Sequence, residues 1–404
     1  MKATALSRNA LVISAAAVML VHCRAAQQIG VPATVEESYV ARALCPKFVG
    51  KPTCSALQVV KRGVAPPCSA SNCGWTPAQL ETAYGLTSAL GNGTGTKVAF
   101  IEMGDLDNAV SDLSTYRSQF GLGTANLTKY NEYGERSKYP PSCQKYGWCI
   151  ESDQDIEMVS AACPKCNIFL IEAKEGIGDL ERAEAEAVKL GATIVSNSWT
   201  CPGSHDCGDK NFAKYFDARG VAYLGASGDA YGNIGAPAAL ASVIAVGGTQ
   251  LVLSGSKYSE TLWYESGGGC AGPSEVGGSG IPKPSWQKDP DCKYRTVVDV
   301  SAEAGCEPGV SVYSGIYERW WEACGTSVST PFMGGVIALA GNADKLDAGK
   351  TFWTFNSKRH QRYFLHPSGV GVGSCGNYLC GHGRYKKRYS GPGGWGSPNG
   401  IKGF

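Results

Sequence analysis

The chain has 404 residues, of which 18% are charged, and its formal net charge at pH 7 is +2. This small and balanced charge argues against the basic surface of a nucleic-acid-binding protein, so we expect no nucleic-acid partner. The length suffices for one large α/β domain or for two smaller ones.

Residues 1–26 have the pattern of a secretory signal peptide. Lys2 and Arg8 precede an apolar run over residues 10–21. This run is too short and too early to be a membrane span. A lipoprotein cleavage site is the alternative for this region, but His22 stands where such sites carry a small residue. The sequence therefore predicts a secreted, extracellular protein without a membrane span.

The cysteine count agrees with export. Of the 17 cysteines, Cys23 falls in the leader, which leaves 16, an even number. A zinc site at Cys163 and Cys166 would need a second cysteine pair at suitable spacing, and none is evident. We therefore expect a disulfide-stapled protein, although connectivity does not follow from sequence. The closely spaced pairs are Cys45/Cys54, Cys68/Cys73, Cys143/Cys149, Cys163/Cys166, Cys201/Cys207 and Cys375/Cys380.

Residues 27–74 carry prolines and cysteines and are only weakly periodic. They form either a propeptide or a stapled arm that lies on the main domain, and the sequence does not choose between the two. Residues 75–404 are the expected main domain.

From Thr76 onward, apolar β-branched runs typical of buried strands alternate with helical stretches. In one of these stretches apolar residues recur at helical spacing and Gly191 ends the helix. The alternation predicts an α/β fold with a mostly parallel sheet and helices on both faces. The expected strands are 97–103, 167–173, 192–196, 221–225, 242–246 and 296–300, and the expected helices are 108–120, 152–162, 179–190, 212–218 and the segment that begins at Ser327.

A Gly-Thr-Ser turn at residues 325–327 opens a segment that stays small and apolar to residue 340, as a helix covered on all sides would. Ser327 would then lie at a helix N-terminus, where free backbone N–H groups and the helix dipole stabilise an oxyanion. This position suits a nucleophile. The alternative is an ordinary cap on a buried helix, which the turn alone does not exclude.

A serine nucleophile needs a base, and the usual base is a histidine held by a carboxylate. None of the five histidines lies in the His-Gly-Thr-His helix start of subtilisins, and Glu102 rather than an aspartate ends the strand expected over 97–103. If Ser327 is a nucleophile, its base is therefore expected to be a carboxylate.

Residues 149–163 contain four acids within seven positions, a density that is also typical of a solvated helix start. Glu151 and Asp155 lie one helical turn apart and continue into apolar residues, whereas Asp153 and Glu157 continue into a more polar face. The first pair is expected to face the core, where acids are costly unless they are used.

Asp229 follows the strand expected over 221–225, in a Ser-Gly-Asp turn. Functional groups gather at the carboxyl ends of parallel strands. Gly-Asp is also ordinary turn chemistry, so both interpretations stay open from these residues alone.

Taken together and in this order, Glu151 with Asp155, Ser-Gly-Asp229 and Gly-Thr-Ser327 resemble the sedolisins, which are serine-carboxyl peptidases of subtilisin-like fold. The resemblance covers roughly residue 75 to the C-terminus. Further similar stretches are 111–121, 194–198, 246–249, 283–286, 299–302 and 396–400.

The resemblance implies that Ser327 is the nucleophile, Glu151 the general base, Asp155 the group that orients Glu151, and Asp229 a protonated oxyanion donor. A carboxylate base and a neutral carboxylic acid both work best in acid. The resemblance therefore implies a secreted serine-type endopeptidase that hydrolyses peptides or proteins at about pH 3–5. We expect it to be a monomer.

The chain also departs from the family. Members commonly carry a longer propeptide, and they bind calcium near the C-terminus through aspartates, whereas residues 365–369 and 389–394 contain none. We therefore expect no metal and no other cofactor, with disulfides such as Cys375/Cys380 as the local staple. Two other functions stay open: a catalytically inactive sedolisin-like binding or decoy protein, and a histidine-dependent serine hydrolase.

Overall fold

The structure is a computed structural model, and it describes residues 39–45, 52–61, 73–201, 210–232, 234–355, 357–368 and 375–404. The expected signal peptide lies outside these residues, as do Cys68 and Cys207, the partners expected for Cys73 and Cys201.

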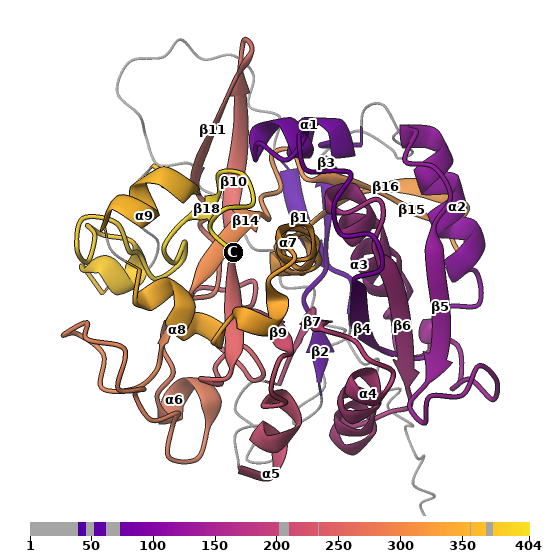
Figure 1. Ribbon diagram of the computed structural model, residues 1–404, viewed down its shortest axis with the longest axis horizontal. Coiled ribbons are helices and arrows are strands. Elements are labelled where there is room, and N and C mark those ends of the chain that lie inside the picture. Colours follow the sequence, from indigo (N-terminus) through magenta and orange to yellow (C-terminus); the bar gives the residue numbers. More distant parts are fainter. Residues whose placement is uncertain are drawn as a thin grey trace, which may run out of the picture.

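Within the described residues, an eight-stranded sheet forms the centre of the molecule (Figure 1). Its pairings are parallel except that of β10 with β11, which form a hairpin that projects at the top of Figure 1. In spatial order the strands are β11 (Lys257–Leu262), β10 (Val243–Ser254), β9 (Ala222–Ala226), β7 (Ile194–Asn197), β4 (Lys97–Met103), β6 (Asn167–Ala173) and β5 (Asn126–Asn131), and β14 (Val300–Glu303) also pairs with β10.

The central strands of this sheet are buried on both faces, because they are apolar in both alternating directions. On β4, Val98 enters the core that it shares with α3 (Cys149–Ala162) and α7 (Thr326–Ala340). Its neighbour Ala99 enters the core on the opposite face, beside α4 (Ile177–Lys189). The predicted fold class, a mostly parallel sheet with helices on both faces, is confirmed.

A second sheet of four antiparallel strands includes two strands from residues 27–74. Its order is β1 (Tyr39–Ala43), β3 (Leu57–Lys61), β16 (Arg319–Cys324) and β15 (Val310–Ser314). In addition, β2 (Thr53–Cys54) pairs with β8 (Trp199–Thr200). This N-terminal region therefore supplies strands to sheets that it shares with the rest of the chain.

The described chain contains further helices and strands outside these two sheets and the three helices named above. Among its helices, none combines the length and the apolar character of a membrane span. These elements are α1 (Pro77–Ala83), α2 (Ala109–Phe120), α5 (Lys210–Ala213), α6 (Pro273–Val276), α8 (Ala348–Trp353), α9 (Ser357–Tyr363), β12 (Gly269–Cys270), β13 (Thr296–Val297), β17 (Phe364–Leu365) and β18 (Ser397–Pro398).

One expected strand and one expected helix need correction. The strand expected over 296–300 is interrupted at Val298, whose N–H donates to the Gly391 carbonyl at 3.1 Å, so that β13 and β14 are separate. The helix expected over 212–218 is shorter than predicted: α5 gives way to a 3-10 turn that ends at Phe216, where aromatic side chains pack closely.

The expectation that Asp153 and Glu157 lie on a polar face is wrong. Every residue of α3 is buried, because α2 and β15 cover the side of this helix that carries the two acids. Glu157 Oε2 accepts a hydrogen bond from the Tyr313 N–H at 2.9 Å, and Asp153 lies beside Asp112 and Ser314. Burial raises the pKa of both carboxyl groups well above the ordinary range.

Disulfides staple the described chain at short and longer separations. Two bonds that spacing did not suggest are Cys270–Cys292 and Cys306–Cys324, whose partners lie 22 and 18 residues apart. Four expected pairs are confirmed: Cys45–Cys54, Cys143–Cys149, Cys163–Cys166 and Cys375–Cys380.

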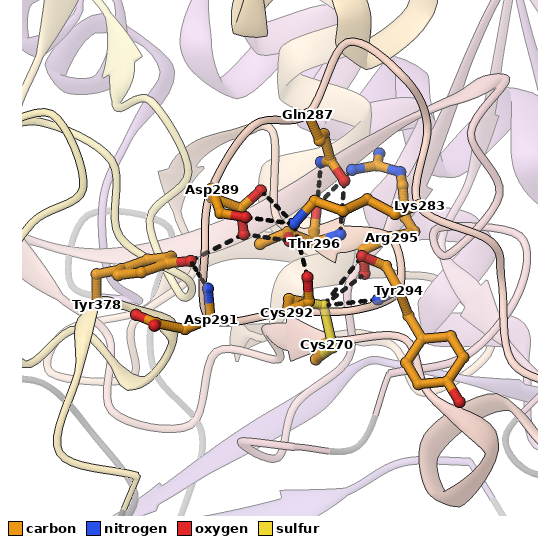
Figure 2. The surroundings of a disulfide bond; sticks show 10 residues. All are labelled: Cys270, Lys283, Gln287, Asp289, Asp291, Cys292, Tyr294, Arg295, Thr296 and Tyr378. Atoms are coloured by element: carbon orange, nitrogen blue, oxygen red, sulfur yellow. Dashed lines mark hydrogen bonds and ion pairs between the residues drawn. A yellow bond between two sulfur atoms is a disulfide. The ribbon is translucent and has the colours of Figure 1, made fainter.

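Figure 2 shows how the Cys270–Cys292 bond is embedded. Lys283 Nζ lies 2.9 Å from the Asp289 carboxylate and donates to the Cys292 carbonyl at 2.7 Å. The Tyr378 hydroxyl donates to the same carboxylate at 2.8 Å. The disulfide bond and these polar contacts thus connect residues 283–292 to Tyr378 in the C-terminal region.

The buried acids of α3 should make the protein less stable at neutral pH than in acid. A carboxyl whose pKa is raised by folding keeps its proton above the pKa of the unfolded chain, so stability falls as pH rises past about 4.3. Glu157→Gln imitates the protonated group. We expect it to increase the free energy of unfolding at about pH 7 by on the order of 1 kcal/mol and to change it little at about pH 4.

Urea unfolding at the two pH values measures this difference. Glu135→Gln is the matched control, because Glu135 is exposed and its contacts, with Lys138 at 3.7 Å and with the Asn131 amide at 3.5 Å, are long. Equal effects of Glu157→Gln at both pH values would contradict the interpretation.

Candidate active site

Ser327 lies in the first turn of α7, as the sequence predicts. β16 ends immediately before Gly325, which has a φ of 111° and precedes the helix. A side chain at Gly325 would collide with the backbone carbonyl of Ser55, so this turn requires glycine. Ser327 is fully buried, and its Oγ donates to the Ser198 carbonyl at 3.1 Å.

α3 packs against α7 and carries Glu151 and Asp155 toward Ser327. Asp155 Oδ1 accepts a hydrogen bond from the Ser198 hydroxyl at 2.7 Å. Glu151 lies close enough to the Ser327 hydroxyl for that hydroxyl to favour its charged form. The structure therefore brings together the expected nucleophile and the expected acid pair, and Ser198 contacts two of the three.

The electrostatic state of Glu151 follows from its surroundings. Burial, followed by the charge of Asp155 and then that of Asp229, raises its pKa well above the ordinary range. The Ser327 hydroxyl and the Ala56 backbone act in the opposite direction. Glu151 is thus a carboxyl group that holds its proton more tightly than an exposed glutamate does.

Glu102 also lies beside Glu151 and Asp155, although it is not among the site residues expected from the sequence. It is fully buried, and its Oε2 accepts a hydrogen bond from the Ser152 hydroxyl at 3.3 Å. Burial, and then the charges of Asp155 and Glu151, raise its pKa well above the ordinary range. Its position near the carboxyl end of β4 was the available signal, since the ends of parallel strands gather at one edge of a sheet.

Asp155 lies between Glu102 and Ser198. Burial raises the pKa of Asp155 to about 8, and hydrogen bonds with the Ser198 hydroxyl and the Glu102 carboxyl oppose this rise. Glu102 therefore stabilises the charged form of Asp155.

Asp229 follows β9, and it lies beside the residue that precedes the nucleophile. Its Oδ1 accepts hydrogen bonds from the Thr326 N–H at 2.7 Å and from the Thr326 hydroxyl at 2.8 Å. The Thr326 hydroxyl in turn accepts a hydrogen bond from the Gly228 N–H at 3.1 Å. The fourth expected residue is thus fixed next to the N-terminus of α7.

The three described histidines, His360, His366 and His382, lie in the C-terminal region. His360 stacks on Trp395 with ring centroids 4.3 Å apart, and His366 lies beside Arg384 and Arg388. Burial is the main cause that lowers the pKa of His360 and of His366 to about 4. Within the described chain, the Ser327 hydroxyl lies beside the Glu151 carboxyl group and the Ser198 carbonyl group, and not beside an imidazole.

The segment 365–368 does not fit the calcium ion that the family resemblance implies. Arg384 Nη2 donates to the Pro367 carbonyl at 2.5 Å, so a guanidinium already binds this oxygen. Burial is the main cause that depresses the pKa of His366, and the nearby positive charges of Arg388 and Arg384 add to it. Calcium needs anionic or neutral oxygen ligands, and the described residues at this place present cationic groups.

We therefore expect the stability of the protein to be independent of calcium. Removal of divalent cations with a chelator, or addition of calcium, should leave the Tm of the full chain unchanged in differential scanning calorimetry. A chelator-dependent fall in Tm that calcium reverses would contradict this expectation.

A family model described as the subtilase family (Peptidase_S8) matches residues 147–356. Kumamolisin of Bacillus sp. (strain MN-32) is 30% identical over 265 residues, which cover 60% of this chain and 46% of kumamolisin. The chain thus spans about half the length of this curated relative.

A solved structure of Pseudomonas sedolisin, a serine-carboxyl proteinase complexed with two molecules of pseudo-iodotyrostatin, aligns with a TM-score of 0.64 and 23% identity. The alignment covers 81% of this chain and 95% of that one. This likeness confirms the subtilisin-like fold. Because the family model matches half of its length, the chain belongs to the subtilase family.

Proposed function

We propose that the chain is a serine-type endopeptidase that hydrolyses peptide bonds in acid, with Ser327 as its nucleophile. The observation that carries this proposal is the buried hydroxyl of Ser327 beside the carboxyl group of Glu151, at the N-terminus of α7. Membership of the subtilase family and the likeness to sedolisins support the same reaction type.

In the first half of the reaction, Glu151 takes the proton of Ser327 while Oγ attacks the carbonyl carbon of the substrate. Asp155 orients Glu151, and Ser198 holds Asp155 through its hydroxyl. The carbonyl oxygen becomes negative, and a protonated Asp229 donates a hydrogen bond to it. A donor at such an oxyanion typically contributes about 3–4 kcal/mol to stabilisation of the transition state.

In the second half, Glu151 passes its proton to the leaving amine and then accepts a proton from water. The water oxygen attacks the ester on Ser327, which releases the new carboxyl terminus and restores the hydroxyl. The proton that Glu151 took from water returns to Ser327 Oγ.

The pH dependence follows from the two opposite requirements. Glu151 must be ionised to accept a proton, so activity falls when pH drops through the range in which the coupled carboxyl groups become protonated. Asp229 must be protonated to donate, so activity is lost as pH rises past the range in which it ionises. These two requirements give a bell-shaped profile, and we propose that its maximum lies in acid because the resemblance to sedolisins implies an acid-acting enzyme.

Secretion and a peptide or protein substrate belong to the same proposal. The disulfides of the described chain agree with an oxidising compartment. The signal peptide expected over residues 1–26, and the expected monomeric state, stay predictions.

Ser327→Ala should abolish hydrolysis of a mixed peptide library, because it removes the attacking oxygen. The measurement is the rate of hydrolysis across the range from about pH 3 to about pH 8. Ser329→Ala is the matched control, since Ser329 lies on the same helix, is buried, and donates to the Thr326 carbonyl at 3.0 Å. Full activity in Ser327→Ala, or activity that rises toward pH 8, would overturn the proposal.

Glu102 should act as a positioning residue through Asp155. Glu102→Ala removes a partner that favours the charged form of Asp155, so kcat should fall by about 10-fold and the acid limb of the pH profile should move to higher pH. Glu102→Gln retains a hydrogen-bond donor and should retain most of the activity. Variants that lose activity equally without moving the pH profile would show a merely structural role.

A further inference from the structure

Asp229 and Thr326 are arranged so that both hydrogen-bond donors of the threonine face one oxygen of the carboxyl group. The Thr326 N–H donates to Asp229 Oδ1 at 2.7 Å, and the Thr326 hydroxyl donates to the same oxygen at 2.8 Å. Thr326 immediately precedes the proposed nucleophile Ser327. The two oxygens of Asp229 therefore have unequal surroundings, because Oδ1 already accepts two hydrogen bonds.

The direction of the Thr326 hydroxyl proton follows from a second contact of this hydroxyl. A hydroxyl group has one proton to donate and two lone pairs that accept, whereas a backbone N–H can only donate. The Gly228 N–H donates to Thr326 Oγ1 at 3.1 Å. The hydroxyl is therefore the acceptor toward Gly228, and its own proton is directed to Asp229 Oδ1.

The turn that carries the Gly228 N–H is fixed from its other side. Gly228 has a φ of 102°, which favours glycine at this position. Its carbonyl accepts a hydrogen bond from the Gly267 N–H at 2.7 Å, and the Ser227 hydroxyl donates to the Gly267 carbonyl at 3.1 Å. A Cβ atom on Gly267 would lie 2.2 Å from the Ser227 carbonyl oxygen, so the two backbones are in direct contact. This contact holds the Gly228 N–H against Thr326.

The second carboxyl oxygen of Asp229, Oδ2, lies toward Gly325. A Cβ atom built on Gly325 would lie 2.8 Å from this oxygen and 3.4 Å from the carboxyl carbon of Asp229. A side chain at residue 325 would displace the carboxyl group, and glycine leaves room for it in the turn before α7. Oδ1 thus lies at the Thr326 donors, and Oδ2 lies beside this turn.

This asymmetry determines where a protonated Asp229 carries its proton. The proton of a carboxylic acid lies on one of the two oxygens, and that oxygen is the donor. A proton on Oδ1 would bring three positively polarised hydrogen atoms together at one oxygen, since two already point to it. The proton is therefore on Oδ2. An oxyanion donor stabilises the transition state only if its proton points to the developing charge.

We propose that Thr326 is a positioning residue for the oxyanion donor: its N–H and its hydroxyl confine the proton of Asp229 to Oδ2, the oxygen that donates to the oxyanion. This inference rests on the proposed function and adds a further residue to the same site. Thr326 acts through Asp229.

The Thr326 hydroxyl has two opposite effects on the reaction. It directs the proton of Asp229 to the donating oxygen, which raises kcat. It also stabilises the ionised carboxylate, because hydrogen bonds to a charged group favour its charged form, so Asp229 loses its proton at a lower pH. Removal of the hydroxyl should therefore lower kcat and extend the remaining activity to higher pH. A general loss of packing would lower kcat without the second effect.

The charged surroundings of Asp229 stay the same when Thr326 is changed. Glu151, on α3, is the ionisable group whose charge interacts with that of Asp229. The segment 266–268, which packs against the turn, consists of a serine and two glycines, and the first turn of α7 contains no acidic side chain. A difference in pH profile between Thr326 variants therefore results from the hydroxyl.

Thr326→Val removes the hydroxyl and retains the N–H and the shape of the side chain. We expect its kcat to fall by about 10-fold, its KM to stay unchanged, and the alkaline limb of its pH profile to move up by about 1 pH unit. Thr326→Ser retains the hydroxyl and should restore both kcat and the profile. The measurement is the hydrolysis of one peptide between about pH 3 and about pH 8.

Thr330→Val is the matched control, because Thr330 is buried on the same helix and its hydroxyl donates to the Thr326 carbonyl at 2.7 Å. This control should leave kcat and the pH profile unchanged. Thr326→Val also deprives the Gly228 N–H of its acceptor, so its Tm should fall. Should Thr326→Val fail to fold, Thr326→Ala takes its place with the same expectation, since its smaller side chain leaves space for water beside this N–H.

The outcomes separate this inference from the function on which it rests. An alkaline limb that stays in place when the hydroxyl is removed, whether or not kcat falls, would overturn the inference and leave the proposed function intact. Equal impairment of Thr326→Ser, or an equal effect of Thr330→Val, would do the same. A wild type that hydrolyses no peptide, or a Ser327→Ala variant with full activity, would overturn the proposed function and the inference with it.

Discussion

Close packing of α3 against α7 is the interaction on which the candidate site depends. Gly335 permits it, because a Cβ atom there would lie 2.5 Å from the Cβ of Ala162. This approach places carboxyl groups from one helix beside a hydroxyl at the start of the other, with no room for bulk water. Isolated charges are costly in such a place, so the carboxyl groups hold their protons or share their charge through hydrogen bonds with Ser198 and Glu102.

The same burial links stability to the proposed working pH. Acids with raised pKa values, among them Asp153 and Glu157 on α3, favour the folded state at low pH. His360 and His366 have the opposite effect, because their pKa values of about 4 lie below the pKa of a histidine in the unfolded chain. The folded state therefore becomes less stable as pH falls from about 6.5 to about 4. Low pH thus stabilises the core beside the site, which contains buried acids. It destabilises the C-terminal region, because the two buried histidines there are more stable in the neutral form.

Much of the fold could be predicted from sequence, because local patterns determine it. The apolar strands of a doubly covered sheet, and the small apolar helix after Gly325, are visible in composition and spacing. The spacing of Glu151 and Asp155 placed them on one side of α3. The expectation failed for Asp153 and Glu157, since their burial depends on α2 and β15, which are remote in sequence.

The rest of the site depends on contacts that no local pattern contains. Ser198 joins the acid pair to the nucleophile through bonds that span 43 and 129 residues. Glu102 lies near the carboxyl end of β4, which comes close to α3 only in the assembled sheet. The path of residues 52–61 between β8 and β16 likewise exists only once both strands are in place. Residue chemistry indicated a carboxylate base, and the tertiary structure indicates what surrounds it.

The central claim is that a carboxyl group, and not an imidazole, activates Ser327. The most direct measurement is mass spectrometry of the covalent adduct formed when an activated ester is quenched in acid, with the wild type and Glu151→Gln compared. The account predicts an acyl group on the peptide that contains Ser327 in the wild type, and almost none in Glu151→Gln. Equal acylation of both proteins, or an adduct at another residue, would contradict it.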